Sequence, residues 1–407
     1  MNKKIGVSII LLGLCIIAFG DWVSIGPQGG QIYCGAVSND NPPVIYIAPA
    51  VSPTPILKST DRGETWTAVG SLSSYPYAMA VDPNNSSIVY AVSSSRCYKS
   101  TNGGTSWSQY TILTNTYFQS LAINPLNSQV LYAGGYAYDG SSWHPCVARS
   151  TNGGANWTVV NTDTASNSYN YSIAIDPVDT TIVYAGGYAN ARSAFYKSTD
   201  RGETWTRYEF PINVSYVYSL YVSPLNHQIV LAGATSGVMR STDGGINWTR
   251  QSTYSYNYSM CAVPNAPNII YTGSYTSVCR SNDTGRTWVS LSSGIGGKTV
   301  RCVMTDPYDT NLVYCGTTAG MFKSTNSGNN WQEINNGILI GKIPVVSIKP
   351  TEPHTLFIEF ADNAVFKSTD DGNTWQRLPE ILGCGNLCAI TFHPTDPLII
   401  WLLEGSG

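Results

Sequence analysis

The stretch Ser59-Thr60-Asp61-Arg62-Gly63-Glu64-Thr65-Trp66 decides the fold, because its pattern, Ser-x-Asp/Asn-x-Gly-x-x-Trp, recurs along the chain. The seven later copies are Ser100 to Trp107, Ser150 to Trp157, Ser198 to Trp205, Ser241 to Trp248, Ser281 to Trp288, Ser324 to Trp331 and Ser368 to Trp375. Successive tryptophans are 40 to 50 residues apart. That period is typical of the four-stranded blade of a β-propeller.

The chemistry of the motif is that of a hairpin turn. An Asp or Asn side chain caps backbone N–H groups two residues further on, a Gly accepts a positive φ, and the Trp begins the outgoing strand. Asn replaces Asp in three copies, which a capping role tolerates and a catalytic carboxylate would not. A structural role is therefore predicted for Asp61, Asn102, Asn152, Asp200, Asp243, Asp283, Asn326 and Asp370.

A second signature lies between the motifs and completes each repeat. Ala80-Val-Asp-Pro83 followed by Ile88-Val-Tyr-Ala91 predicts two strands joined by a proline turn, and related prolines stand at 125, 177, 224, 264, 307, 350 and 394. Each repeat thus supplies four antiparallel strands, A to D. The prediction is an all-β propeller of eight complete blades and a partial ninth.

The two ends of the chain bear on its organisation. Lys3 and Lys4, the apolar stretch 6–17 and Ala18-Phe19-Gly20 predict a signal peptide at residues 1–20, and the propeller then occupies 21–407. Trp22-Val-Ser-Ile-Gly26 resembles a D strand and is expected to complete the last blade. Because the last repeat stops after two strands, we expect a fragment of a longer protein.

Composition narrows the partners and the location. Only 12% of residues are charged, the net charge is −3, and the chain has no basic block that could bind nucleic acid. The four histidines are dispersed, so we expect no metal site, and no motif indicates a cofactor. We expect a secreted, periplasmic or cell-surface protein with no transmembrane segment beyond the signal peptide.

Two further residue types follow the repeat. A Lys or Arg precedes the Ser of every motif, at 58, 99, 149, 197, 240, 280, 323 and 367, and is therefore interpreted as a repeat feature. Of the nine cysteines left in the mature chain, Cys34, Cys261, Cys302 and Cys388 occupy the same strand of different repeats. A small buried apolar role is expected for these four.

Over residues 22–407, the eight motifs and the Asp-Pro…Val-Tyr-Ala segments resemble the Asp-box (BNR) repeat propellers. That superfamily includes sialidases, xyloglucanase-like endoglucanases with two seven-bladed propellers, and ten-bladed sortilin/Vps10 receptors. The sequence features typical of the enzymes in this superfamily are missing from this chain. No Arg-Ile-Pro precedes the first motif, no arginine of the mature chain precedes Arg62, and Ile45 to Lys58 contains no acid where the endoglucanases have a catalytic Asp.

Tyrosines mark the face opposite the Asp-boxes. The eighth residue before the proline turn is Tyr75, Tyr117, Tyr169, Tyr216 and Tyr256 in five successive blades. The sixth is Tyr77, Tyr171, Tyr218 and Tyr258, with Tyr33 matching in the first blade. The pattern fails in later blades, where Arg301 and Lys342 appear. Two interpretations stay open: an aromatic lining that binds sugar rings or a peptide, or packing between neighbouring blades.

These features favour a non-catalytic, exported module that binds a glycan or protein ligand through the tyrosines. The alternative is a glycoside hydrolase of the sialidase or endoglucanase kind, with its acids on the tyrosine-rich face or in a missing C-terminal part. Weaker candidates for such acids are Glu359 with Asp362, and Asp139 beside Trp143 and His144. A third possibility is a structural module with no ligand of its own.

Overall fold

A computed structural model describes residues 29–338, apart from 191 and 211–213, and the segments 346–349, 355–360, 364–370, 374–378, 387–392 and 400–404. Every named element is a β-strand. Within these residues, no helix has the length and hydropathy needed to span a membrane. The predicted signal peptide and the strand expected at 22–26 lie outside the described residues.

The first four blades are four-stranded antiparallel sheets whose strands pair in chain order. Blade 1 contains β1 (Ile32–Val37), β2 (Ile45–Pro49), β3 (Thr54–Ser59) and β4 (Thr67–Leu72). Blade 2 contains β5 (Ala78–Asp82), β6 (Asn85–Ser93), β7 (Arg96–Ser100) and β8 (Ser108–Thr111). Blade 3 contains β9 (Thr116–Ile123), β10 (Leu131–Tyr138), β11 (Trp143–Ser150) and β12 (Thr158–Asn161). Blade 4 contains β13 (Tyr169–Ile175), β14 (Val183–Ala189), β15 (Arg192–Ser198) and β16 (Thr206–Tyr208).

The next three blades repeat this order. Blade 5 contains β17 (Val217–Val222), β18 (Val230–Ala234), β19 (Gly237–Ser241) and β20 (Thr249–Arg250). Blade 6 contains β21 (Ser259–Val263), β22 (Ala266–Gly273), β23 (Val278–Ser281) and β24 (Val289–Leu291). Blade 7 contains β25 (Val300–Thr305), β26 (Val313–Thr317), β27 (Gly320–Ser324) and β28 (Gln332–Glu333).

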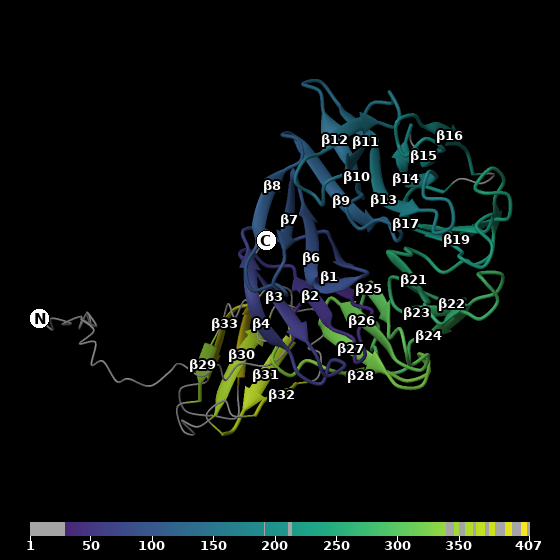
Figure 1. The fold of residues 1–407 in the computed structure, drawn as a ribbon. Coiled ribbons are helices and arrows are strands. Elements are labelled where there is room, and N and C mark those ends of the chain that lie inside the picture. The colour runs from purple at the N-terminus through teal and green to yellow at the C-terminus, as the bar shows by residue number, and fades with distance from the viewer. Residues whose placement is uncertain are drawn as a thin grey trace, which may run out of the picture.

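The seven blades form a closed ring in which blade 7 packs on blade 1 (Figure 1). Ile32, Ile47 and Leu57 of blade 1 share one buried cluster with Met304 and Tyr314 of blade 7. The predicted propeller of four-stranded antiparallel blades is confirmed, but the predicted number of eight blades and a partial ninth is wrong. The number of Asp-boxes gives the number of sequence repeats. The number of blades in the ring depends instead on which later blade packs against the first one.

Polar contacts close the seam between blades 7 and 1. Trp66 donates from its indole nitrogen to the Ile334 carbonyl (2.8 Å) and from its backbone nitrogen to the Asn336 carbonyl (2.9 Å). Arg62 pairs with the fully buried Asp306, Nε to Oδ2 at 3.0 Å. The first Asp-box thus joins the two ends of the ring directly.

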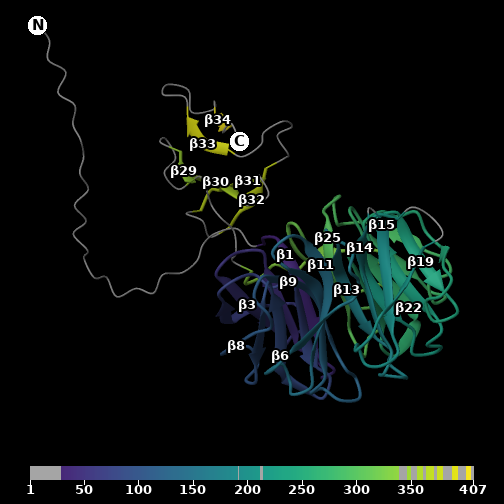
Figure 2. The same ribbon diagram turned by 90° about the horizontal axis from the view of Figure 1, so that it is seen from above.

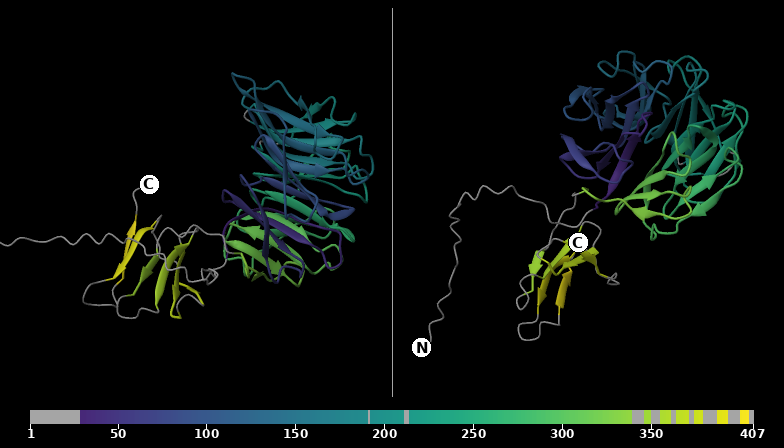
Figure 3. Two further views of the ribbon diagram at one scale, coloured as in Figure 1. Left: turned by 60° about the vertical axis from the view of Figure 1, so that its left-hand side comes forward. Right: turned by 60° about the horizontal axis from the view of Figure 1, so that its bottom comes forward.

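Two further sheets lie outside the ring (Figures 2 and 3). One contains β29 (Val346–Ile348), β30 (Leu356–Phe360), β31 (Ala364–Ser368) and β32 (Gln376–Arg377). The other is the pair β33 (Leu387–Phe392) and β34 (Ile400–Glu404). The eighth Asp-box belongs to the first of these sheets and not to the ring.

The Asp-boxes form the expected turns, with one difference in the bonding. In the first, Ser59 Oγ accepts from the Gly63 N–H at 2.8 Å, and Asp61 Oδ1 accepts from the Thr65 N–H at 3.0 Å. The capped N–H is therefore four residues beyond the Asp, and not two as the Asx-turn analogy predicts. Ser and Asp or Asn share the turn, which explains why both positions are fixed in the motif.

In six blades the basic residue before the Ser contacts the next blade. Lys99 donates to the Gly153 carbonyl and Lys197 to the Gly244 carbonyl, both at 2.9 Å. Each ammonium also lies over a buried tyrosine of its own blade, 5.3 Å from the Tyr90 ring centroid for Lys99. Both cations therefore make contacts within the propeller ring.

Cysteine usage also follows the repeat. The seven cysteines in the described residues are free thiols. Cys34 and Cys302 are buried, and Cys261 is half-buried. Burial raises the pKa of Cys302 to about 12, so this thiol stays protonated and behaves as a small apolar group. The side chain of Cys388 lies outside the described residues.

The Asp-box carboxylates should make the protein sensitive to acid. Hydrogen bonds from Thr204 and Ser198 lower the pKa of Asp200 to about 2, and bonds from Asn247 and Ser241 overcome partial burial to lower that of Asp243 to about 2. Because these folded-state values lie below the unfolded value of about 3.9, their stabilisation is present above pH 4 and is lost as the pH falls toward 2. We expect the double variant Asp200→Asn/Asp243→Asn to lose less stability across that interval, measured by urea unfolding at each pH. A wild-type-like acid slope would contradict this assignment; Asn is the natural residue in three other boxes.

Candidate functional site

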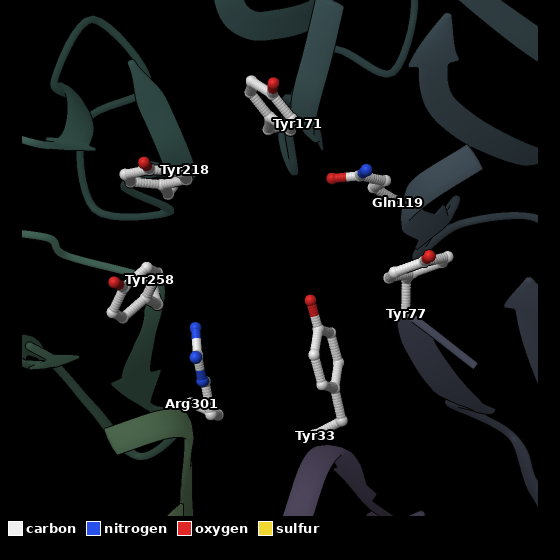
Figure 4. Close-up of a pocket in the computed structure, with 7 residues that line it drawn as sticks. All are labelled: Tyr33, Tyr77, Gln119, Tyr171, Tyr218, Tyr258 and Arg301. Carbon is white, nitrogen blue, oxygen red and sulfur yellow. The ribbon is translucent and has the colours of Figure 1, made fainter. Parts of the chain in front are cut away.

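A pocket of about 350 Å³ opens on the ring axis. Its lining takes one residue from each of the seven blades, in chain order around the axis (Figure 4). We call these seven residues the axial ring: Tyr33, Tyr77, Gln119, Tyr171, Tyr218, Tyr258 and Arg301. The volume is in the range of pockets that bind small molecules.

β-Bulges place most of the axial ring. In the pairing of β13 with β14, Asn170 faces Gly187 and Ser172 faces Gly186, so Tyr171 is an extra residue with no partner. The same register shift falls at Tyr33, Gln119, Tyr218 and Arg301 in their blades. A bulge re-aims a side chain out of the alternation of the strand. In these five blades it turns one residue of the innermost strand toward the axis.

In blades 3 and 4, a glycine of the second strand lies against the bulge. A Cβ on Gly187 would overlap the Tyr169 carbonyl oxygen and lie 2.8 Å from the Asn170 Cα. Gly135 is in the same situation opposite Tyr117 and Phe118 in blade 3. The second Gly of each Ala-Gly-Gly sequence is thus fixed by the close approach of the bulged strand.

The five tyrosines eight residues before the proline turn form a second layer, defined as Tyr75, Tyr117, Tyr169, Tyr216 and Tyr256. Several of them wedge between blades: the Tyr216 ring lies 5.8 Å from Tyr171 of the preceding blade, and Tyr75 lies 5.9 Å from Tyr33. Tyr117 and Tyr256 remain more than one-third exposed. The axial ring thus faces the pocket, whereas the second layer packs between blades.

The axial ring carries a single charge. Burial raises the pKa of Tyr218 to about 12, and it raises the pKa of Tyr77 and Tyr171 further, so these phenols are neutral donors. The guanidinium of Arg301 lies 4.8 Å from the Tyr258 ring centroid and 5.9 Å from that of Tyr33. Burial also raises the pKa of Tyr33, and the charge of Arg301 opposes that rise.

Sequence reasoning found part of this arrangement. Of the predicted ligand-binding residues, Tyr77, Tyr171, Tyr218 and Tyr258 line the pocket, as does Tyr33, whereas the second layer does not. Gln119 and Arg301 were not predicted as ligand-binding residues, because the predicted set was defined by residue type, tyrosine, and not by position in the repeat. Both are the sixth residue before their proline, so the count itself carried the signal.

The other candidate acids divide into two cases. Asp139, in the loop between β10 and β11, accepts hydrogen bonds from the backbone of Ser141 and Ser142 and lies 2.9 Å from His144 Nε2. The backbone bonds hold its pKa well below the usual value, so it cannot serve as a general acid near neutral pH. The Glu359 side chain, Asp362 and Lys342 lie outside the described residues. Within the part of the chain that the structure describes, no group of three His, Cys, Asp or Glu could hold a metal ion.

Comparison with known proteins identifies relatives of two kinds. The model of the Sortilin-Vps10 family (sortilin, neurotensin receptor 3) matches residues 54–190 and 276–380, more than half of the chain. A xyloglucanase of Hypocrea jecorina is 32% identical over 157 residues, which are 31% of this chain and 19% of that enzyme. Xyloglucanase Xgh74A of Acetivibrio thermocellus is 36% identical over 98 residues, 20% of this chain and 12% of that enzyme.

Solved structures show the same fold. An ancestral GH74 enzyme superposes with a TM-score of 0.73 at 22% identity, over 95% of this chain and 60% of that one. The GH74 xyloglucanase of Xanthomonas campestris gives 0.66 at 15% identity, over 91% and 71%. This chain therefore spans only part of the length of these relatives. The sequence relatives are enzymes, so the preference for a non-catalytic module is not supported, and the hydrolase alternative fits them better.

Proposed function

Because this chain belongs to the Sortilin-Vps10 family and its sequence relatives are xyloglucanases, we propose that it is a polysaccharide-active propeller, a glycoside hydrolase of the xyloglucanase type. In this proposal the described ring supplies a substrate-binding surface. The observation that carries it is the axial ring, which gathers five tyrosines around one pocket.

The chemistry of the surface suits a sugar. Tyrosine offers a flat apolar face for the C–H side of a pyranose and a hydroxyl for its oxygens, at little cost in side-chain entropy. The aromatic surface continues from the pocket across blade 3, where the Tyr136 ring lies 5.2 Å from Trp143 and Tyr138 lies 5.0 Å from Trp143. A polysaccharide chain has more contact area there than a single sugar would need.

Hydrolysis requires two carboxyl groups about 5 to 10 Å apart, one of them a proton donor. The residues that line the axial pocket include no carboxylate, and Asp139 on the same face is held as an anion. This observation favours a second candidate, a propeller that binds the polysaccharide without cleaving it. We propose that a catalytic pair, if this chain contributes to one, includes acids away from the axial pocket.

Binding and cleavage of xyloglucan separate the two candidates. We expect the purified chain to bind xyloglucan in calorimetry, and Tyr171→Ala/Tyr218→Ala to weaken binding at least about tenfold, since two stacking faces are removed. Tyr110→Ala, on an outer strand, is the matched control and should leave binding unchanged. Release of reducing ends supports the hydrolase, and binding without release supports the second candidate. Wild-type affinity in the double tyrosine variant would refute both assignments of the surface.

A further inference from the structure

We infer that the axial pocket is a selective site for an acidic sugar, a monosaccharide unit whose carboxylate pairs with Arg301. The inference goes beyond the proposed function, which rests on the tyrosine surface and concerns xyloglucan. It follows from the charge, the hydrogen-bonding state and the shape of one cavity.

Arg301 is a cation with no protein anion. In the described part of the chain it forms no ion pair, and its Nε is buried without a hydrogen-bond partner. The other two described arginines with such an Nε both have an acidic partner, Glu203 at 3.6 Å for Arg149 and Asp163 at 3.0 Å for Arg207. A half-buried guanidinium with no acidic partner and a free Nε donor is a site for a carboxylate, which it can bind through two parallel hydrogen bonds.

The neighbours of Arg301 fix its position without neutralising it. Its guanidinium lies between the Tyr258 and Tyr33 rings, at 4.8 and 5.9 Å from their centroids. Figure 4 shows the guanidinium between these two tyrosine rings, with the Tyr33 hydroxyl pointing to the middle of the axial ring. Aromatic faces attract the cation, and the Tyr258 side chain also forms a hydrogen bond with Arg301, but neither ring supplies a negative charge. The Nε donor therefore remains available to a ligand that enters the pocket.

The rest of the lining suits a pyranose. The five phenols are neutral and can donate or accept, and Gln119 adds an amide, which already donates to the Tyr136 hydroxyl at 3.3 Å. The main groups that shift the pKa of these tyrosines electrostatically are other tyrosines, a cysteine thiol and Arg301, and none of them is a carboxylate. A ligand with one negative charge and several hydroxyls matches this pocket better than a neutral or a multiply charged ligand.

The test compares sugars that differ in the group at C6, which is charged in only one of them. Binding of D-glucuronate, D-glucuronamide and D-glucose is measured by calorimetry on the full chain, with acetate and a short N-acetylated peptide bearing a free C-terminal carboxylate as the other arms. We expect glucuronate to bind at least about tenfold more tightly than either neutral sugar, because a charge-assisted bidentate pair is added. Acetate should bind far more weakly, since it cannot use the phenols.

Arg301→Gln should abolish the preference for glucuronate, so that glucuronate and glucuronamide bind the variant with affinities within about twofold of each other. Arg96→Gln is the matched control, since Arg96 is an exposed cation in the hairpin between β6 and β7 and should have no effect. Thermal unfolding of each variant establishes that it is folded, and Arg301→Lys is substituted if Arg301→Gln is not. The Lys variant should retain the charge but lose the bidentate advantage.

Three outcomes would overturn the inference: equal affinity for glucuronate and glucuronamide, an undiminished preference in the folded Arg301 variant, or tighter binding of the peptide than of the sugar. Failure of the acidic-sugar site can be distinguished from failure of the proposed function. Xyloglucan is a neutral polysaccharide, so its binding to the unaltered chain tests the tyrosine surface without a carboxylate contact. Loss of xyloglucan binding in the tyrosine variants with no response to glucuronate would refute the acidic-sugar site alone.

Discussion

Replacing Trp66 with alanine should lower the free energy of unfolding by about 3–5 kcal/mol and open the ring between blades 7 and 1. Trp66 is only 4% exposed and packs in the cluster that joins Ile32 and Leu57 to Tyr314 and Ile338. Its indole also donates to the Ile334 carbonyl, so the substitution removes both an apolar contact and a hydrogen bond across the seam. Urea unfolding measures the loss of stability, and amide hydrogen exchange locates the opening.

Trp248→Ala is the matched control for this experiment. Trp248 is equally buried, at 4% exposure, but its indole donates to Gly245 of its own Asp-box and it packs on Phe195 and Phe210. We expect a similar loss of stability with exchange increased around blade 5, whereas Trp66→Ala should increase exchange in β1 and β25. If both variants gave the same exchange pattern, the seam would not depend on Trp66.

The architecture of each blade could be predicted from sequence because its determinants are local. Ser59, Asp61, Gly63 and Trp66 all act within one turn, and the tyrosine of each Val-Tyr-Ala segment is buried in its own sheet. The number of blades in the ring could not be predicted in this way. It depends on the contact between Met304 and the first blade, between residues that are far apart in sequence and carry no repeat signal of their own.

The site was predictable to a similar extent. Counting back from the proline found the tyrosines that line the pocket, since the count follows the strand. The alternation of side chains along a strand predicts that positions six and eight before the proline share one face. The bulge breaks that alternation, so Tyr171 turns to the axis while Tyr169 packs against Tyr136 at 4.7 Å. Register shifts of this kind arise from pairing with the next strand and have no signature within the strand itself.

In blades 3 and 4 a glycine of the second strand lies against the bulge, whereas blades 1, 5 and 7 have Pro49, Ala234 and Thr317 at that position. The glycine of blade 4 gives the second large effect. We expect Gly187→Val to lower the free energy of unfolding by about 3 kcal/mol, because the added side chain overlaps the backbone of Tyr169 and Asn170 and only a shift of β13 can relieve the overlap. That shift moves Tyr171 away from the axis. Xyloglucan and glucuronate binding should therefore both fall by at least about tenfold, measured by calorimetry on protein shown by circular dichroism to be folded.

Gly297→Ala provides the comparison, since a Cβ there has nothing within 4 Å although the residue has a φ of +72°. Its expected cost is about 1–2 kcal/mol from the backbone alone, with no change in binding. A smaller variant, Gly187→Ala, should give an intermediate loss in both measurements, because the Cβ itself makes the overlap. If Gly187→Val destabilised the protein but bound both ligands normally, the bulge would be a packing feature of blade 4 and not the device that aims Tyr171 into the pocket.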